Sequence, residues 1–246
     1  MKPHDNSARF YDCIYEKRFG ARLNQLTETN LQQIQQLIPR GGKIVDFGAG
    51  TGRLSIPLAK LGYEVQAIDI SQKMLDVLVE KANKEKLNIQ TFNGIRHTDW
   101  SKDMVVAVFT VLAYILDEEN MSIFLKLMYD SLKPGGYFMF DLVKKVPYET
   151  SCRINNCVVI DKNIDNYSDF VKVELFNNNG NTFAHYSEKV DIICNNERFE
   201  GGEDFDIRFW NIQQLENLPE FYGFTKIKQF DLAGADYFIY QKNKLL

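Results

Sequence analysis

The chain has 246 residues, of which 45% are hydrophobic and 25% charged, close to ordinary globular usage. This balance excludes a mainly disordered, collagen-like or membrane-spanning protein, and a chain of this length buries on the order of 70% of its unfolded surface. The 29 basic and 33 acidic residues give a net charge of −4, so neither nucleic acid nor a membrane is expected as a partner.

The four cysteines, Cys13, Cys152, Cys157 and Cys194, are spread along the chain. No pair has the C-x-x-C spacing of a metal or redox motif, and none lies near a histidine at ligand spacing. The pattern therefore predicts reduced thiols in a cytoplasmic protein, and no metal site. The polar N-terminus predicts no secretory signal, and no apolar run approaches membrane-spanning length.

The first part of the chain alternates helical and strand patterns. Apolar residues recur at helical spacing from Gly20 to Ile38, and Pro39 ends that helix. The sequence then predicts a buried strand over 43–47, a glycine-rich turn over 48–52, a helix over 53–61, a strand over 64–70 and a helix that Ser71 caps.

The same rhythm continues to about residue 142. It predicts a weak strand over 89–92, a buried strand over 104–111, a helix from Asp117 to about Leu132, a tight turn over 133–136 and a buried strand over 137–142. Strand, turn and helix repeated in this way predict an α/β fold, in which a doubly wound, mostly parallel sheet carries helices on both faces.

The pattern changes after Val143. From about Cys152 to Phe209 there is little helical periodicity, and polar and apolar residues alternate over 171–175 and 182–192 around an asparagine-rich turn. This segment predicts an antiparallel sheet inserted after the fifth strand. A short helix over 212–218 and two strands over 224–230 and 237–241 follow, and the short link between these strands predicts an antiparallel pair.

The strongest functional pattern is IVDFGAGTG, from Ile44 to Gly52, where the first strand turns into a helix. Open parallel sheets bind ligands at this edge, and glycines let the backbone approach a ligand closely. Asp69 ends the next strand, where a carboxylate can accept hydrogen bonds from both hydroxyls of a ribose, each worth roughly 1.5–3 kcal/mol. The alternative interpretation is an ordinary turn with a capping aspartate.

The glycine spacing separates two classes of cofactor. Dinucleotide-binding folds favour G-x-G-x-x-G, with the third glycine inside the helix, whereas this chain has G-x-G-x-G followed by Arg53. The P-loop pattern of nucleoside triphosphate-binding proteins is missing as well. A nicotinamide-dependent oxidoreductase on the same layered architecture is an alternative that this spacing disfavours.

The run from Asp46 to Gly52 resembles the first motif of the class I S-adenosylmethionine-dependent methyltransferases. Asp69 matches their ribose-binding acid, LKPGG over 132–136 matches the turn before their fifth strand, and the closing strand pair matches their sixth and seventh strands. The resemblance implies a seven-stranded sheet of order 3-2-1-4-5-7-6 and a bound S-adenosylmethionine. Tyr11 to Tyr15, before a helix carrying Arg22, resembles the branch that acts on glycine or on amino sugars.

The resemblance also implies where the cofactor lies. The glycine bend would lie under its amino acid and ribose parts, and Ile70 would pack on the adenine. The family usually has a Gly-Asp pair after the third strand, whereas this chain has Asn93-Gly94-Ile95-Arg96, so the backbone of Ile95 is the expected adenine contact. The cofactor-binding residues implied are Tyr11, Arg22, Asp46, Gly48, Ala49, Gly50, Asp69, Ile70, Gly94, Ile95, Phe109 and Thr110.

Four residues are candidates for contacting the substrate. By resemblance, Tyr15 lies near the sulfonium and Tyr114 lies where substrate-facing residues follow the fourth strand. His185 is a candidate general base in the inserted segment, and Arg208 is a candidate for holding a carboxylate or phosphate. For the last two, the alternative is a structural or surface role.

The function predicted is methyl transfer from S-adenosylmethionine to a nitrogen or oxygen of a small molecule, by a monomer or homodimer. Positioning supplies roughly 7–11 kcal/mol of barrier reduction in such reactions, so no catalytic triad is needed. The segment from Phe109 to Tyr114 lacks the Asn/Asp-Pro-Pro-Tyr turn of enzymes that methylate nucleic-acid bases or glutamine amides. The unusual adenine-site sequence motivates one alternative, a non-catalytic module that binds S-adenosylmethionine.

The expected organisation is an N-terminal helical segment over residues 1–42 followed by a methyltransferase domain over 43–246. Within that domain, the inserted sheet at about 150–209 would cover the substrate.

Overall fold

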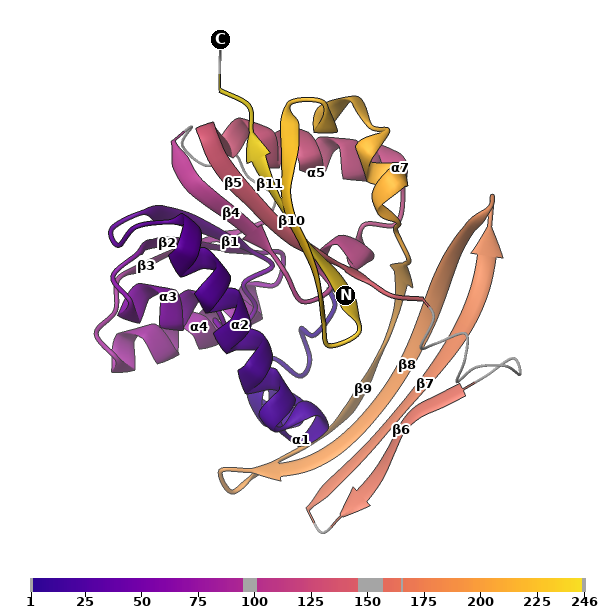
Figure 1. Cartoon of the computed structure of the whole chain (residues 1–246). Helices are drawn as coiled ribbons and strands as arrows, with labels where there is room; N and C mark the ends of the chain where they lie inside the picture. Colours follow the sequence, from indigo (N-terminus) through magenta and orange to yellow (C-terminus); the bar gives the residue numbers. More distant parts are fainter. Residues whose placement is uncertain (1, 95–100, 146–156, 165, 245–246) are drawn as a thin grey trace.

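The computed structural model describes residues 2–94, 101–145, 157–164 and 166–244, and Figure 1 shows how its elements are arranged. The helices are α1 (Tyr11–Phe19), α2 (Ala21–Leu37), α3 (Ser55–Lys60), α4 (Gln72–Lys84), α5 (Glu118–Ser131) and α7 (Ile212–Glu216), with 3₁₀ turns η1 (Val111–Tyr114) and η2 (Pro219–Phe221). The strands are β1 (Lys43–Phe47), β2 (Glu64–Asp69), β3 (Ile89–Asn93), β4 (Lys102–Ala107), β5 (Leu132–Val143), β6 (Cys157–Ile164), β7 (Tyr167–Asn178), β8 (Asn181–Cys194), β9 (Glu197–Arg208), β10 (Phe224–Leu232) and β11 (Ala235–Lys242).

Seven strands form one sheet, in the order β10-β11-β5-β4-β1-β2-β3. The strands β1 to β5 pair in parallel, and β11 is antiparallel to both β5 and β10. With β10 and β11 counted as the sixth and seventh strands, this is the order 3-2-1-4-5-7-6, so the fold prediction is confirmed.

Two apolar layers cover the faces of this sheet. On one face, Val45 and Phe47 of β1 pack with Phe124 of α5. On the other, Ile44 packs with residues of α2 and α3, including Leu58. Burial on both faces explains why β1 and β4 read as continuous apolar runs, and it fixes the strand ends on which the cavity described below is built.

The second sheet has the order β6-β7-β8-β9 and is antiparallel throughout. It is the inserted antiparallel sheet, or cap, predicted at about 150–209, and its strands run from Cys157 to Arg208. In Figure 1 its long curved strands lie beside the seven-stranded sheet, and α1 lies against their lower end.

Three local predictions differ from the structure. The helix predicted from Gly20 is preceded by a separate helix, α1. Gly20 adopts φ of 53°, which is not a helical value, so the two helices do not form one continuous helix. The fourth strand ends at Ala107 instead of Val111, since Phe109 and Thr110 both have positive φ. The predicted turn over 133–136 is instead part of β5, which shifts register against β4 at this point.

Cys13 of α1 and Cys194 of β8 form a disulfide, with their Cα atoms 6.6 Å apart. The expectation of reduced thiols is therefore wrong for this pair, because the fold brings together cysteines that lie 181 residues apart in the sequence. Of the other cysteines, Cys152 lies outside the described residues and Cys157 begins β6. Among the helices of the described residues, none is long and apolar enough to cross a bilayer.

Candidate functional site

The glycine-rich bend after β1 forms one wall of a cavity. Gly48 and Gly50 have left-handed backbones, with φ of 72° and 55°. The amides of Gly48 and Ala49 donate to the Ile68 carbonyl of β2 at 2.8 and 3.0 Å, which ties the bend to the neighbouring strand. A Cβ added at Gly48 would lie 2.4 Å from Cγ2 of Val111, so the bend requires a residue without a side chain there.

Asp69 ends β2 with its carboxylate turned toward this bend. Its Oδ2 accepts a hydrogen bond from the Gly50 amide and its Oδ1 one from the Ser71 amide, both at 2.8 Å. Burial raises the pKa of this carboxyl, and the two amides oppose the increase. Each carboxylate oxygen keeps a further lone pair, so Asp69 can still accept hydrogen bonds from a ligand in the cavity that it lines.

Two more carboxyl groups are buried near the cavity. Asp46 of β1 accepts from the Ser55 hydroxyl at 2.6 Å, and Asp141 of β5 accepts from the Thr110 amide at 3.2 Å. Burial raises the pKa of each carboxyl to about 6. The hydrogen bond from the Thr110 amide to Asp141 stabilises the left-handed turn, and both residues of this turn, Phe109 and Thr110, line the cavity.

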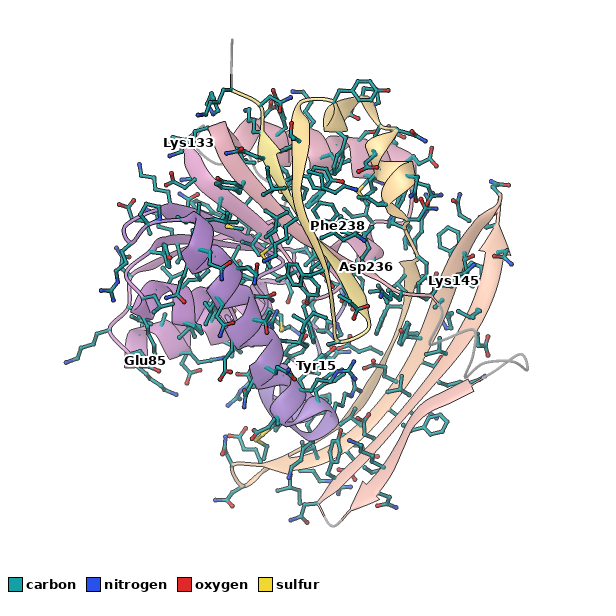
Figure 2. All side chains as sticks on the ribbon, in the orientation of Figure 1. Tyr15, Glu85, Lys133, Lys145, Asp236 and Phe238 are labelled. Carbon is teal, nitrogen blue, oxygen red and sulfur yellow. A yellow bond between two sulfur atoms is a disulfide. The ribbon has the colours of Figure 1, made fainter. Side chains whose placement is uncertain are left out.

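The cavity has a volume of about 490 Å³, within the range of small-molecule sites. Figure 2 shows one of its lining residues, Tyr15 of α1, between the two sheets. The predicted cofactor-binding residues that line the cavity are Tyr11, Asp46, Gly48, Ala49, Gly50, Asp69, Ile70, Phe109 and Thr110, and the predicted substrate residues are Tyr15 and Tyr114. Elsewhere in the described ranges, as here, no three His, Cys, Asp or Glu side chains gather as a metal site.

The N-terminal segment closes one side of the cavity. Lys2 donates to the Ile70 carbonyl, and Asp5 accepts from the Ser71 hydroxyl at 2.5 Å. His4 lines the cavity, and its Nε2 lies 3.0 Å from the Tyr114 hydroxyl. Sequence reasoning missed this segment, because a polar N-terminus carries no periodicity and its partners are distant in the chain.

Polar side chains around the bend were also missed. Asp12 of α1 accepts from the Thr51 hydroxyl at 2.5 Å and pairs with Lys81 of α4 at 2.6 Å. The Arg53 guanidinium lies 4.8 Å from the ring centroid of Phe109 and also lines the cavity. Thr51 and Arg53 could have been predicted as site residues, because Thr51 lies within the glycine motif and Arg53 directly follows it.

A buried ion cluster joins α1 to the cap. The Arg18 guanidinium donates to Asp169 at 2.7 and 2.9 Å and to Glu188 at 3.2 and 3.0 Å. The hydroxyl of Tyr167 donates to the same Asp169 carboxylate at 2.5 Å. Together with the disulfide, these contacts fix the tyrosine-bearing helix to the cap sheet.

Two predicted cofactor-binding residues do not line the cavity. Arg22 lies on α2 beside the turn between β10 and β11, near Asp231 and Ala233, whereas the next two residues of the helix, Leu23 and Asn24, line the cavity. Gly94 instead donates its amide to the Asp69 carbonyl at 2.9 Å. The structure does not bring these two residues to the cavity wall, so their contact with the cofactor stays a prediction, and Ile95 lies outside the described residues.

His185 does not face the cavity either. Alternate residues of a strand face opposite sides of the sheet, and its neighbour Ala184 packs inward against η1. The Nδ1 of His185 lies 2.7 Å from Asp206 on the other face. His185 as the base next to the substrate is therefore a wrong prediction.

Arg208 is a structural residue in the junction between the cap and η1. Its side chain is only 3% exposed, and its guanidinium lies 3.4 Å from the ring centroid of Trp210. It donates to the Leu116 carbonyl at 3.2 Å and to Asn181 at 2.8 Å. Its predicted role in substrate binding is wrong, because these partners lie away from the cavity.

Comparison with known proteins adds an independent line of evidence. Residues 44–136 match the family model described as a methyltransferase domain. A Bacillus subtilis (strain 168) protein named putative methyltransferase YqeM is 32% identical over 196 residues, which is 76% of this chain and 68% of that protein.

Two solved structures are similar over nearly the whole chain. An S-adenosylmethionine-dependent methyltransferase from Clostridium acetobutylicum ATCC 824 has a TM-score of 0.81 at 16% identity and covers 97% of this chain and 100% of its own. CalS10 from Micromonospora echinaspora, described as an amino pentose methyltransferase with bound S-adenosylmethionine, has a TM-score of 0.72 at 14% identity, covering 95% and 97%. At these identities, both similarities concern the fold.

Proposed function

Since the chain belongs to the class I S-adenosylmethionine-dependent methyltransferases, we propose that its substrate is a small molecule methylated on nitrogen or oxygen. Membership of this enzyme family sets aside the nicotinamide-dependent and non-catalytic alternatives. The observation that carries the proposal is the Asp69 carboxylate, held by the Gly50 amide of the glycine bend at the edge of a cavity that the N-terminal segment and α1 also line.

The residues around the bend fit S-adenosylmethionine. The bend has no side chain at Gly48, where a Cβ would meet Val111, and Asp69 has lone pairs left for the ribose hydroxyls. Asp46 would attract the amino group of the cofactor, and Arg53 would attract its carboxylate. When bound there, S-adenosylmethionine supplies a methyl group activated by its positively charged sulfur.

The aromatic residues opposite the bend would position the substrate. Tyr11, Tyr15 and Tyr114 line this part of the cavity. Burial raises the pKa of all three hydroxyls, so they stay protonated and uncharged at neutral pH. Such a lining excludes water and fixes the line of approach, which is the contribution that methyl transfer needs most from its protein.

Closure on several sides supports a small substrate. The N-terminal segment covers the cavity next to Asp69, and the cap is joined to α1 by the disulfide and the Arg18 cluster. The similar CalS10 structure is described as that of an amino pentose methyltransferase, which supports a substrate of metabolite size. In this proposal, the glycine bend and β2 bind the cofactor, and α1, η1 and the cap bind the substrate.

Calorimetric titration with S-adenosylhomocysteine tests the cofactor half of the proposal. Asp69→Ala removes the proposed ribose acceptor, and each charge-assisted hydrogen bond is worth roughly 1.5–3 kcal/mol, so affinity should fall at least about tenfold. Asp76→Ala, which removes an exposed carboxylate of α4, is the matched control and should bind like the wild type. Equal affinity for all three proteins would remove the assignment of Asp69.

A screen with methyl-labelled S-adenosylmethionine tests the substrate half. Amines, alcohols and carboxylic acids of metabolite size are offered beside a protein extract and nucleic acid. Label in small molecules supports the proposal, whereas label confined to protein or nucleic acid contradicts it.

A further inference from the structure

At the end of the cavity near the cap, the side chains of Tyr114, His4 and Glu203 lie next to one another in that order. The hydroxyl of Tyr114 lies 3.0 Å from Nε2 of His4. On the other side of the imidazole ring, Nδ1 of His4 lies 3.6 Å from the Glu203 carboxylate of β9. That carboxylate also accepts from the His4 amide and, at 3.1 Å, from the Ser7 hydroxyl. Glu203 is therefore held in place from two directions.

The surroundings of His4 decide where its proton lies. Burial and the nearby Arg18 charge lower the pKa of His4 to about 4, so the ring is neutral at pH 7 and carries one N–H. The carboxylate of Glu203 faces Nδ1 and attracts that proton, which leaves Nε2 as a hydrogen-bond acceptor. Tyr114 then donates its proton to Nε2, and its oxygen has lone pairs left for the cavity.

The neighbours of Tyr114 are consistent with this arrangement. Thr110 lies against its hydroxyl but donates its own proton to the Phe109 carbonyl at 2.6 Å. The hydroxyl of Tyr11 is hydrogen-bonded to Tyr15. The Thr110 oxygen can therefore accept from Tyr114, as Nε2 of His4 can, and with either acceptor the Tyr114 oxygen keeps a lone pair for the cavity.

The charged side chains near Tyr114 also favour a hydrogen-bond donor over an anion as the ligand. Arg18 is occupied by Asp169 and Glu188. Of the Lys and Arg side chains that line the cavity among the described residues, Lys81 is paired with Asp12 and Arg53 lies beside the bend. Among the described side chains, an anionic group next to Tyr114 would thus meet the carboxylate of Glu203 behind His4 and no unpaired cation, so the only positive charge facing it would be the sulfonium of the cofactor.

We propose that Tyr114 recognises the methyl-accepting group as a hydrogen-bond donor, an uncharged N–H or O–H whose nitrogen or oxygen keeps a lone pair for the methyl group. His4 and Glu203 are positioning residues that keep the Tyr114 proton turned away from the cavity. Carboxylates and phosphates are rejected as accepting groups because they bring no proton to donate. This inference rests on the proposed function, and it adds the chemical class of the accepting group.

Nitrogen-15 NMR of the histidine rings tests the arrangement directly, because the chain has only three histidines. His97→Gln and His185→Gln assign the His4 signals by elimination. In the wild type with S-adenosylhomocysteine, His4 should be neutral at pH 7 with Nδ1 protonated and Nε2 bare. Tyr114→Phe should shift the Nε2 resonance, and Glu203→Gln should mix the two tautomers. A His4 with Nε2 protonated, or one that titrates near pH 6.5, would overturn the proposal.

Two probe ions of similar branched shape test the class of accepting group. Isopropylammonium donates hydrogen bonds and carries positive charge, whereas acetate only accepts them and carries negative charge. Added to the protein with S-adenosylhomocysteine, isopropylammonium should shift the His4 Nε2 signal at a concentration at least about tenfold lower than acetate. Tyr114→Phe should abolish this preference, and His185→Gln, the control on the outer face of the cap, should keep it.

Equal responses to both probes, or a stronger response to acetate, would overturn the proposal. Its failure is distinguishable from failure of the proposed function, because binding of S-adenosylhomocysteine is measured in the same samples. A protein that binds S-adenosylhomocysteine but prefers acetate remains a methyltransferase, with a different accepting group.

Discussion

The buried Arg18 offers a direct test of how α1 is held to the cap. Arg18→Met keeps much of the apolar stem but removes the guanidinium, and with it four hydrogen bonds of 2.7 to 3.2 Å. Its partners are also buried, with the Asp169 side chain 0% and the Glu188 side chain 11% exposed. The variant therefore leaves two carboxylates in the interior without a cation.

The expected cost is about 3–5 kcal/mol, the typical loss when one partner of a buried ion pair is removed. Stabilities of whole domains are only about 5–15 kcal/mol, so the midpoint of urea unfolding should fall clearly. Adding Asp169→Asn and Glu188→Gln to Arg18→Met should recover part of this loss, because neutral amides are cheaper to bury than unpaired carboxylates.

Arg198→Met is the matched control, on strand β9 of the cap sheet. Arg198 also donates twice to one carboxylate, Asp191, at 2.9 and 2.7 Å, but its side chain is 60% exposed. Water and salt screen such a pair, so this variant should unfold almost as the wild type does. Equal midpoints for Arg18→Met and Arg198→Met would refute the reasoning, because burial would then not distinguish the two clusters.

Three further variants test other parts of the structure. Burial raises the pKa of Asp46 to about 6 from a usual 3.8, so its ionisation destabilises the fold as pH rises from about 4 to about 6, by up to about 3 kcal/mol. Asp46→Asn should therefore unfold at higher urea than the wild type at pH 7 and should lose part of the pH dependence of stability. An unchanged slope of stability against pH between pH 4 and 6 would count against this reasoning. Cys13→Ser should lower stability by about 2–4 kcal/mol under oxidising conditions and make thermal unfolding insensitive to reductant, in contrast to the wild type; a reductant-sensitive variant would exclude this disulfide as the cause. Gly48→Ala should weaken S-adenosylhomocysteine binding in calorimetry because its Cβ meets Val111, whereas Gly41→Ala, also at positive φ but with open space around it, should bind normally; equal affinities would contradict the role of the bare bend.

The layered fold could be predicted because its signals are local. The apolar runs of β1 and β4 are buried on both faces, and Ser71 and Asp117 cap their helices as expected, accepting from the amides of Met74 and Asn120. Helix α1 escaped prediction because Ile14 is its only fully buried residue, so it has little apolar periodicity. Its position is set instead by aromatic contacts, the ion cluster and the disulfide.

The candidate site divides in the same way. The glycine bend and Asp69 were predictable, because neighbouring parallel strands end at the same edge and their spacing is visible in the sequence. His4 was not, because its partners Tyr114 and Glu203 lie 110 and 199 residues away. Arg208 was assigned to the substrate because arginine is rarely buried, and only the fold reveals that Trp210 covers it.

A crystal structure of the complex with S-adenosylhomocysteine tests the central claim most directly. The account predicts that the ribose hydroxyls donate to the Asp69 carboxylate, that the amino acid part lies on Gly48 to Gly50, and that the sulfur faces the cavity toward Tyr114. Electron density for the ligand elsewhere, or an Asp69 carboxylate that makes no contact with the ribose, would contradict it.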